Sequence, residues 1–197
     1  MPIKNTGTEN LIKETAKRLF FAEGKLHATT QEIADAAGVN RTSLHYYFRS
    51  RDLLLEAVFK EAMQGLSQRL NECMEAKKPF KEKIASLIEV FLKDMIAFPY
   101  QETFLVTEIN TLGKALMNDI QAGPVNTFLA EVKHEMDKGS LEPMDPLHFL
   151  MNLFSLLSYP LIMAPLYQQL FQVSSGDFAL LIKQRKEIIL TMLFKKN

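Results

Sequence analysis

Apolar residues recur every three or four positions along nearly all of the 197 residues, and this period places them on one face of an α-helix. Stretches that alternate apolar and polar residues between hairpin turns, as half-buried β-strands do, are absent from the sequence. Since 47% of the residues are apolar, a chain of this length can bury a substantial core. The sequence therefore predicts an all-α protein with about nine helices.

Glycines and prolines divide this pattern into segments, because they are typical of positions where helices begin or end. The predicted helices span Thr8–Glu23, Thr30–Ala37, Arg41–Phe48, Arg51–Ala76, Phe80–Ala97, Glu102–Leu112, Pro124–Lys138, Pro146–Phe171 and Asp177–Phe194. We expect the long fourth helix to be shared by two parts of the protein. We also expect Pro160 and Pro165 to kink the eighth helix.

The segment from Ile33 to Tyr47 has the pattern of two short helices that cross closely. Ala34 is small where the second helix must approach, and Gly38 can take the positive φ that a tight turn requires. Val39 and Leu44 are the apolar residues expected to fill the crossing. This arrangement is a helix-turn-helix, whose second helix fits the major groove of DNA.

The first residues of this second helix have side chains suited to base edges. Arg41 can pair bidentately with a guanine, and Thr42 and Ser43 can hydrogen-bond bases or touch a thymine methyl group. Taken singly, each feature has a simpler interpretation: an arginine can belong to a solvated face, and Gly38 can be an ordinary helix cap. The joint spacing is what indicates a DNA-binding motif.

The helix before it begins with polar groups. Thr29 and Glu32 form the T-x-x-E pattern of a capping box. Thr29, Thr30 and Gln31 offer hydroxyl, amide and free N–H groups to a phosphate or a neighbouring base. Residues 1–51 contain eight basic and five acidic residues, whereas the whole chain contains 23 of each kind. This excess of positive charge favours a polyanionic partner for the N-terminal part.

The segment TTQEIADAAGVNRTSLHYYFRSRDLL, preceded by TAKRLFFAEG, resembles the DNA-binding domain of the tetracycline-repressor (TetR) family. The motifs TA-x-x-LF-x-x-x-G, T-x-x-IA-x-x-AGV and L-x-YYF-x-S+-x-L, where + is Lys or Arg, occur in the family's order and spacing over about the first quarter of the chain. The resemblance implies a three-helix DNA-binding domain at residues 1–51. It implies a helical ligand-sensing and dimerising domain at residues 52–197.

The resemblance also implies which residues contact double-stranded operator DNA. Thr29, Tyr46 and Arg51 are expected to hold phosphates. Thr30, Gln31, Arg41, Thr42 and Ser43 are expected to read or border bases. Members of the family commonly have Tyr where this chain has His45, so an imidazole contact replaces a phenolic one and is expected to depend on pH.

The remainder of the chain is rich in Met and Phe, which admits two interpretations. These residues can simply fill a core, or they can line a pocket for a small, largely apolar effector between helices. The resemblance favours the pocket and implies a repressor that the effector releases from its operator. The candidate lining residues are Met95, Phe98, Phe104, Met117, Phe128, Met151, Phe154 and Tyr159.

The last two predicted helices are too apolar for one small bundle to cover, and exposed apolar surface of that extent indicates association. By resemblance, these helices form a homodimer interface. A dimer also places two recognition helices about one DNA turn apart, roughly 34 to 36 Å, so that they can read a palindrome together.

Other classes of protein find little support in the sequence. Common hydrolase, metalloprotease and phosphate-loop motifs are absent, so no enzyme is expected. Glu131-x-x-His134 is half of a di-iron motif without its second copy, and we expect neither a metal nor a cofactor. A helical adaptor, or an activator of the same fold without ligand-controlled repression, stays open as an alternative.

The location of the protein follows from similar observations. Cys73 is the single cysteine and cannot form an internal disulfide, and the first residues lack the apolar stretch of a secretory signal. The apolar stretch from Leu147 to Tyr167 contains His148, Asn152 and two prolines, which disfavours a membrane span. We therefore expect a cytoplasmic protein that does not enter a membrane.

Overall fold

The computed structural model describes residues 6–112 and 123–195. Within these residues all regular elements are helices, so the all-α prediction is confirmed. The chain divides into two compact units. The first unit comprises Met1–Gln64 with Ala97–Ile120, and the second comprises Gly65–Ile96 with Gln121–Asn197.

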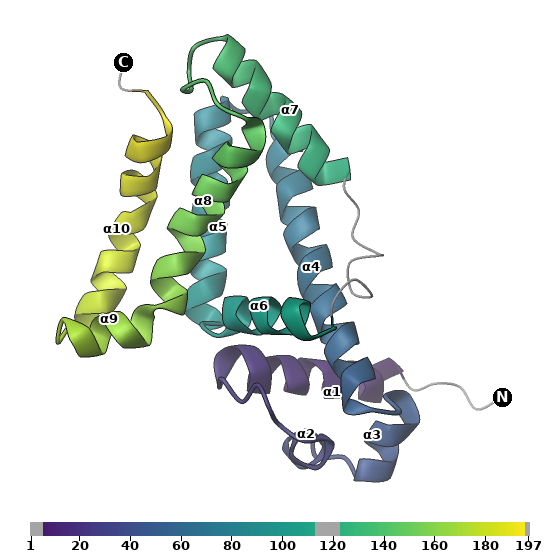
Figure 1. Cartoon of the computed structure of the whole chain (residues 1–197). Coiled ribbons are helices and arrows are strands. Elements are labelled where there is room, and N and C mark those ends of the chain that lie inside the picture. The colour runs from purple at the N-terminus through teal and green to yellow at the C-terminus, as the bar shows by residue number, and fades with distance from the viewer. Residues whose placement is uncertain (1–5, 113–122, 196–197) are drawn as a thin grey trace. The chain divides into compact units, whose positions relative to one another are not determined.

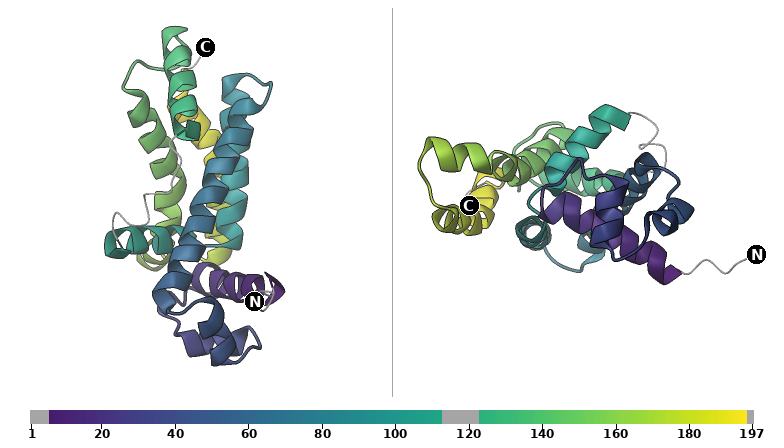
Figure 2. Two further views of the ribbon diagram at one scale, coloured as in Figure 1. Left: turned by 90° about the vertical axis from the view of Figure 1, so that its right-hand side faces the viewer. Right: turned by 90° about the horizontal axis from the view of Figure 1, so that it is seen from below.

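The first unit contains the two helices of the helix-turn-helix and the helices that pack around them. They are α1 (Thr6–Lys17), its π-helical continuation η1 (Arg18–Ala22), α2 (Thr30–Ala36), α3 (Arg41–Tyr47), the first half of α4 (Arg51–Glu75) and α6 (Gln101–Leu112). Helices α2 and α3 contact each other, and both contact α1 (Figure 2). The division between the units falls inside α4, after Gln64.

A π-helical turn ends the first helix, which a simple helical period did not predict. It buries three successive residues, Leu19, Phe20 and Phe21. The ring of Phe104 from α6 stacks on Phe20 at 5.3 Å and meets the edge of Phe21 at 5.0 Å. Two neighbouring aromatic rings of this turn therefore pack against α6.

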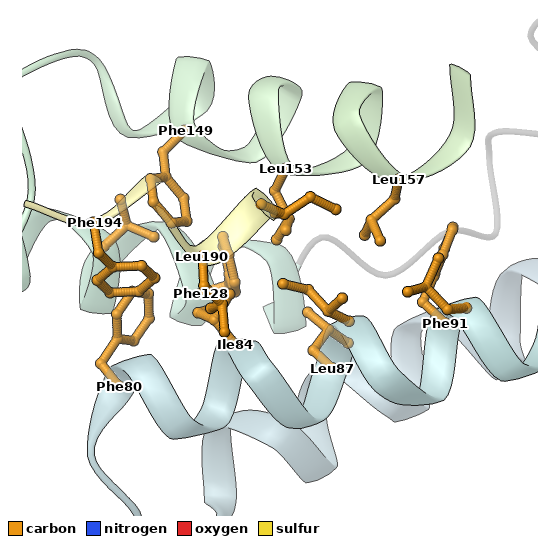
Figure 3. Packing of buried hydrophobic residues seen from close by; sticks show 14 of the residues in the cluster. Phe80, Ile84, Leu87, Phe91, Phe128, Phe149, Leu153, Leu157, Leu190 and Phe194 are labelled. Atoms are coloured by element: carbon orange, nitrogen blue, oxygen red, sulfur yellow. The ribbon is translucent and has the colours of Figure 1, made fainter. Parts of the chain in front are cut away.

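The second unit is a helical bundle with an aromatic core. Its helices are the second half of α4, α5 (Phe80–Ala97), α7 (Gly123–Asp137), α8 (Pro146–Ile162), α9 (Ala164–Leu170) and α10 (Ser175–Leu193) (Figure 1). Helix α8 contacts both α7 and α10. The rings of Phe80, Phe128, Phe149 and Phe194 meet at centroid distances of 6.0 to 6.3 Å and form one end of the core (Figure 3).

The segment predicted as one helix from Pro146 to Phe171 is two helices, α8 and α9, at 57° to each other. Pro160 lies inside α8 and Pro165 lies in the first turn of α9, so the break at Met163 falls between the prolines. The predicted kink is confirmed, and it is large enough to end the helix. In the described part of the chain no single helix is long and apolar enough to cross a membrane, although α8 and α9 together meet that test.

Candidate nucleic-acid interface

Helix α2 begins with the capping box that the sequence predicts. The Thr29 hydroxyl accepts the Glu32 N–H at 3.2 Å, and the Glu32 carboxylate accepts the Thr29 N–H at 2.7 Å. These hydrogen bonds from Thr29 lower the pKa of the Glu32 carboxyl below its usual value. Thr29 also donates its hydroxyl to Glu32 at 2.8 Å, so its polar groups serve the helix start.

The turn between α2 and α3 is built as the sequence predicts. Gly38 has a φ of +66°, and a Cβ there would meet nothing within 4 Å, so the requirement for glycine comes from the backbone angle alone. Ala34 and Leu44 are buried, and Val39 packs against the same core. Asn40, which the sequence reasoning missed, caps α3 by accepting the Ser43 N–H at 2.7 Å.

The leading end of α3 faces outward. Arg41 and Thr42 are exposed, and Ser43 is half-buried. His45 lies one helical turn after Arg41 and is also exposed, as is Tyr46, whose ring meets the edge of Tyr47 at 5.1 Å. The buried Leu44 anchors the opposite side of the helix. Helix α3 therefore exposes one polar face.

A cleft of about 270 Å³ lies beside this face. It is lined by Thr30, Arg41, Leu44, His45, Arg49, Ser50 and Arg51. Three of these side chains are guanidinium groups, whereas none is a carboxylate. The cleft is therefore a concentrated cationic surface, which is the electrostatic condition for holding phosphates.

Arg49 is the member of this cleft that the sequence reasoning left out. It is exposed and lies between Phe48, which is buried, and the start of α4. The sequence did contain a signal for Arg49, because it is a basic residue that lies inside the L-x-YYF-x-S+-x-L motif, at the position between Phe48 and Ser50.

Two of the predicted contacts engage neighbours within the protein. The Gln31 side-chain amide donates to the Asp35 carboxylate at 2.7 Å. Arg51 donates from Nε to the Ala28 carbonyl at 2.9 Å and from a terminal nitrogen to the Leu26 carbonyl at 2.5 Å. The guanidinium of Arg51 is thus turned toward the first unit's own backbone.

The candidate effector-lining residues are distributed over both units. Phe98 and Phe104 belong to the first unit, and Met117 lies outside the described residues. Met95 and Phe128 are buried in the core of the second unit, where Phe154 packs its edge against Phe91 at 5.5 Å. Met151 and Tyr159 are both 54% exposed on α8.

In the motif Glu131-x-x-His134, the glutamate forms an ion pair within the second unit. The Lys83 ammonium donates to the Glu131 carboxylate at 2.7 and 3.1 Å and to the Met74 carbonyl at 2.9 Å. No group of three potential metal-ligating side chains occurs in the part of the chain that the structure describes.

The sequence profile of the family described as "Bacterial regulatory proteins, tetR family" matches residues 12–58, which contain the helix-turn-helix and the start of α4. The helix-turn-helix part of this chain is therefore a TetR-type DNA-binding domain. Regulators of this family bind operator DNA and act as dimers.

Individual relatives extend the similarity beyond the matched domain. The regulator RutR of Escherichia coli (strain K12) is 26% identical over 171 residues, which cover 78% of this chain and 77% of that protein. The uncharacterized HTH-type regulator YhgD of Bacillus subtilis (strain 168) is 22% identical over 143 residues, covering 70% and 74%. A TetR-family regulator from Marinobacter aquaeolei VT8 covers the full length of both chains with a TM-score of 0.72 at 14% identity, which supports the fold.

Proposed function

We propose that this chain is a TetR-family regulator, which binds a specific operator through the exposed face of α3 and represses transcription until a small, largely apolar effector releases it. The observation that carries the DNA-binding part is the outward leading end of α3 beside a cleft with three arginines and no carboxylate. A helix presented in this way can enter the major groove while the cleft holds the strand beside it.

The exposed residues divide by chemistry into two roles. Arg41 stands at the first position of α3 and is proposed to read a guanine, with Thr42 and Ser43 bordering the neighbouring bases. Tyr46 and Arg49 are proposed to hold phosphates on the flanking backbone. Thr30, Gln31 and His45 lie near this contact and are proposed to border it. Thr29 contributes by holding the start of α2 in place.

The experiment is a mobility shift on the DNA upstream of the protein's own gene, at fixed salt, for wild type, Arg41→Ala and Arg18→Ala. Arg18 is a matched control, because it is exposed in η1 and pairs with Glu23. We expect Arg41→Ala to lose about 1–3 kcal/mol of discrimination between this DNA and unrelated DNA. Arg18→Ala should bind as wild type does. Unchanged discrimination in Arg41→Ala would refute the reading role.

We further propose that the homodimer forms through α8 and α10. Exposed apolar side chains follow each helix at helical spacing: Leu147, Met151 and Tyr159 on α8, and Leu181, Ile188 and Met192 on α10. Two adjacent helices, each with an uncovered apolar stripe, are typical of a self-association surface. Met192→Glu should convert the dimer to monomer in light scattering, whereas Val106→Glu, at a similarly exposed residue of α6, should leave it unchanged.

Release by an effector rests on the family, together with one feature of the fold. Helix α4 starts directly after the helix-turn-helix and ends in the second unit, so a ligand that favours one arrangement of that unit can act on DNA binding through a continuous helix. We expect a panel of small apolar compounds to contain some that release the operator fragment. A complex that persists under every compound that binds would favour the alternative, a regulator without ligand-controlled repression.

A further inference from the structure

Arg51 is the first residue of α4, yet its guanidinium reaches back to a segment more than 20 residues earlier in the chain. Its Nε donates to the Ala28 carbonyl at 2.9 Å, and a terminal nitrogen donates to the Leu26 carbonyl at 2.5 Å. The guanidinium carbon also lies 6.0 Å from the centre of the Phe20 ring. The side chain is half-buried, and all three of these groups belong to the first unit.

The two carbonyls belong to the segment that decides where α2 begins. Ala28 is buried, and the next residue, Thr29, caps α2. At the other end, Arg51 follows closely after Phe48, the buried residue that ends α3. One side chain thus joins the entrance of α2 to the exit of α3. The relative placement of the two helices determines whether α3 can reach into a groove.

The environment of Arg49 differs from that of Arg51. It lines the same cleft, but it is exposed, whereas Arg51 is half-buried against backbone carbonyls. A planar guanidinium can satisfy two carbonyls at once, and a lysine ammonium is a single point of charge that does not reproduce this fork. A phosphate contact, in contrast, is served well by either residue type.

We propose that Arg51 is a positioning residue, which fixes the helix-turn-helix for DNA binding by bridging the carbonyls of Leu26 and Ala28, and that Arg49 supplies the phosphate contact at this point. The affinity part of this inference rests on the proposed operator binding. The bridging part does not, since it concerns the protein without DNA.

The test compares Arg51→Ala, Arg51→Lys and Arg49→Ala in the full chain. Fluorescence anisotropy with the operator fragment is measured over a salt series from about 50 to 300 mM, because each phosphate contact contributes about 0.9 to the slope of log affinity against log salt. Arg49→Ala should lower the slope by about that amount. Arg51→Ala and Arg51→Lys should each weaken binding by about tenfold or more with an unchanged slope, since they lose hydrogen bonds to a charged group.

A second readout requires no DNA and therefore survives a failure of the proposed function. Hydrogen exchange of the segment 25–32 in the free protein should be faster in both Arg51 variants than in wild type and in Arg49→Ala. If Arg51→Ala fails to fold, Arg51→Lys decides the question. The inference is overturned if Arg51→Lys binds DNA and exchanges as wild type does, or if Arg51→Ala lowers the salt slope as Arg49→Ala is expected to.

Discussion

The ion pair between Lys83 and Glu131 lends itself to a quantitative prediction. The Lys83 side chain is 9% exposed, and its ammonium has three acceptor atoms: both Glu131 carboxylate oxygens, at 2.7 and 3.1 Å, and the Met74 carbonyl, at 2.9 Å. Glu131→Ala leaves this buried ammonium with the carbonyl alone. The charge then remains in a poorly solvated site, which is the costly outcome of breaking a buried pair.

The expected cost follows from the burial of the two partners. Removing one partner of a buried pair costs roughly 3–5 kcal/mol. Because the Glu131 side chain is 26% exposed, water can reach the site in part, and we expect about 2–3 kcal/mol. This corresponds to a decrease of roughly 4–12 °C in Tm for a chain of this size.

The assay is urea denaturation at neutral pH, followed by far-UV circular dichroism, for wild type, Glu131→Ala, Lys83→Met and the double variant. Lys83→Met removes the buried charge and should cost less, about 1 kcal/mol for the hydrogen bond to Met74. The double variant should be more stable than Glu131→Ala alone, because no buried charge remains. A loss below about 0.5 kcal/mol in Glu131→Ala, typical of surface positions, would refute this reasoning.

Three further predictions concern single residues. Burial raises the pKa of the Cys73 thiol from 9.0 to about 11, so at pH 8 the folded protein should react with a thiol reagent about 100-fold more slowly than the unfolded chain; equal rates would contradict the shift. Burial also raises the pKa of the Glu108 carboxyl above 4.5, so its charge destabilises the fold above that pKa and ceases to do so as the pH falls below about 4.5. Glu108→Gln should therefore raise the urea midpoint at pH 7.5, and the gain should vanish near pH 4; a gain that is independent of pH would contradict this. Gly24→Ala should cost about 1–3 kcal/mol, since Gly24 has a φ of +68° and a Cβ would lie 2.9 Å from the Tyr100 ring. Gly139→Ala is the matched control, because Gly139 has a φ of +83° and open space, so that only backbone strain is added there. Equal losses of stability in the two variants would exclude a packing effect of Tyr100.

The parts of the fold that the sequence predicted are those with local causes. The capping box of Thr29 and Glu32 depends on residues three apart, and the positive φ of Gly38 depends on one turn. The helix from Phe80 to Ala97 has the predicted bounds, because Pro79 and Pro99 flank it. Each of these signals lies within a few positions of the structure that it determines.

The parts that could not be predicted depend on residues distant in sequence. The π-helical turn at Arg18–Ala22 is matched to Phe104, more than 80 residues later. Arg51 faces carbonyls of Leu26 and Ala28 because the tertiary fold brings them together, and its residue type alone is equally suited to a phosphate. An apolar side chain such as Met151 can line a pocket, fill a core or face a partner, and its spacing does not distinguish these.

The measurement that tests the central claim most directly is the ratio of dissociation constants of the full-length protein for the DNA upstream of its gene and for a shuffled fragment of the same length, at one salt concentration. If the exposed face of α3 reads bases, the upstream fragment should bind at least about a thousandfold more tightly. Arg41→Ala should reduce that ratio while retaining the binding to shuffled DNA. A ratio near one for the wild type would show that the cationic surface around α3 binds DNA without reading its sequence, and would contradict the account.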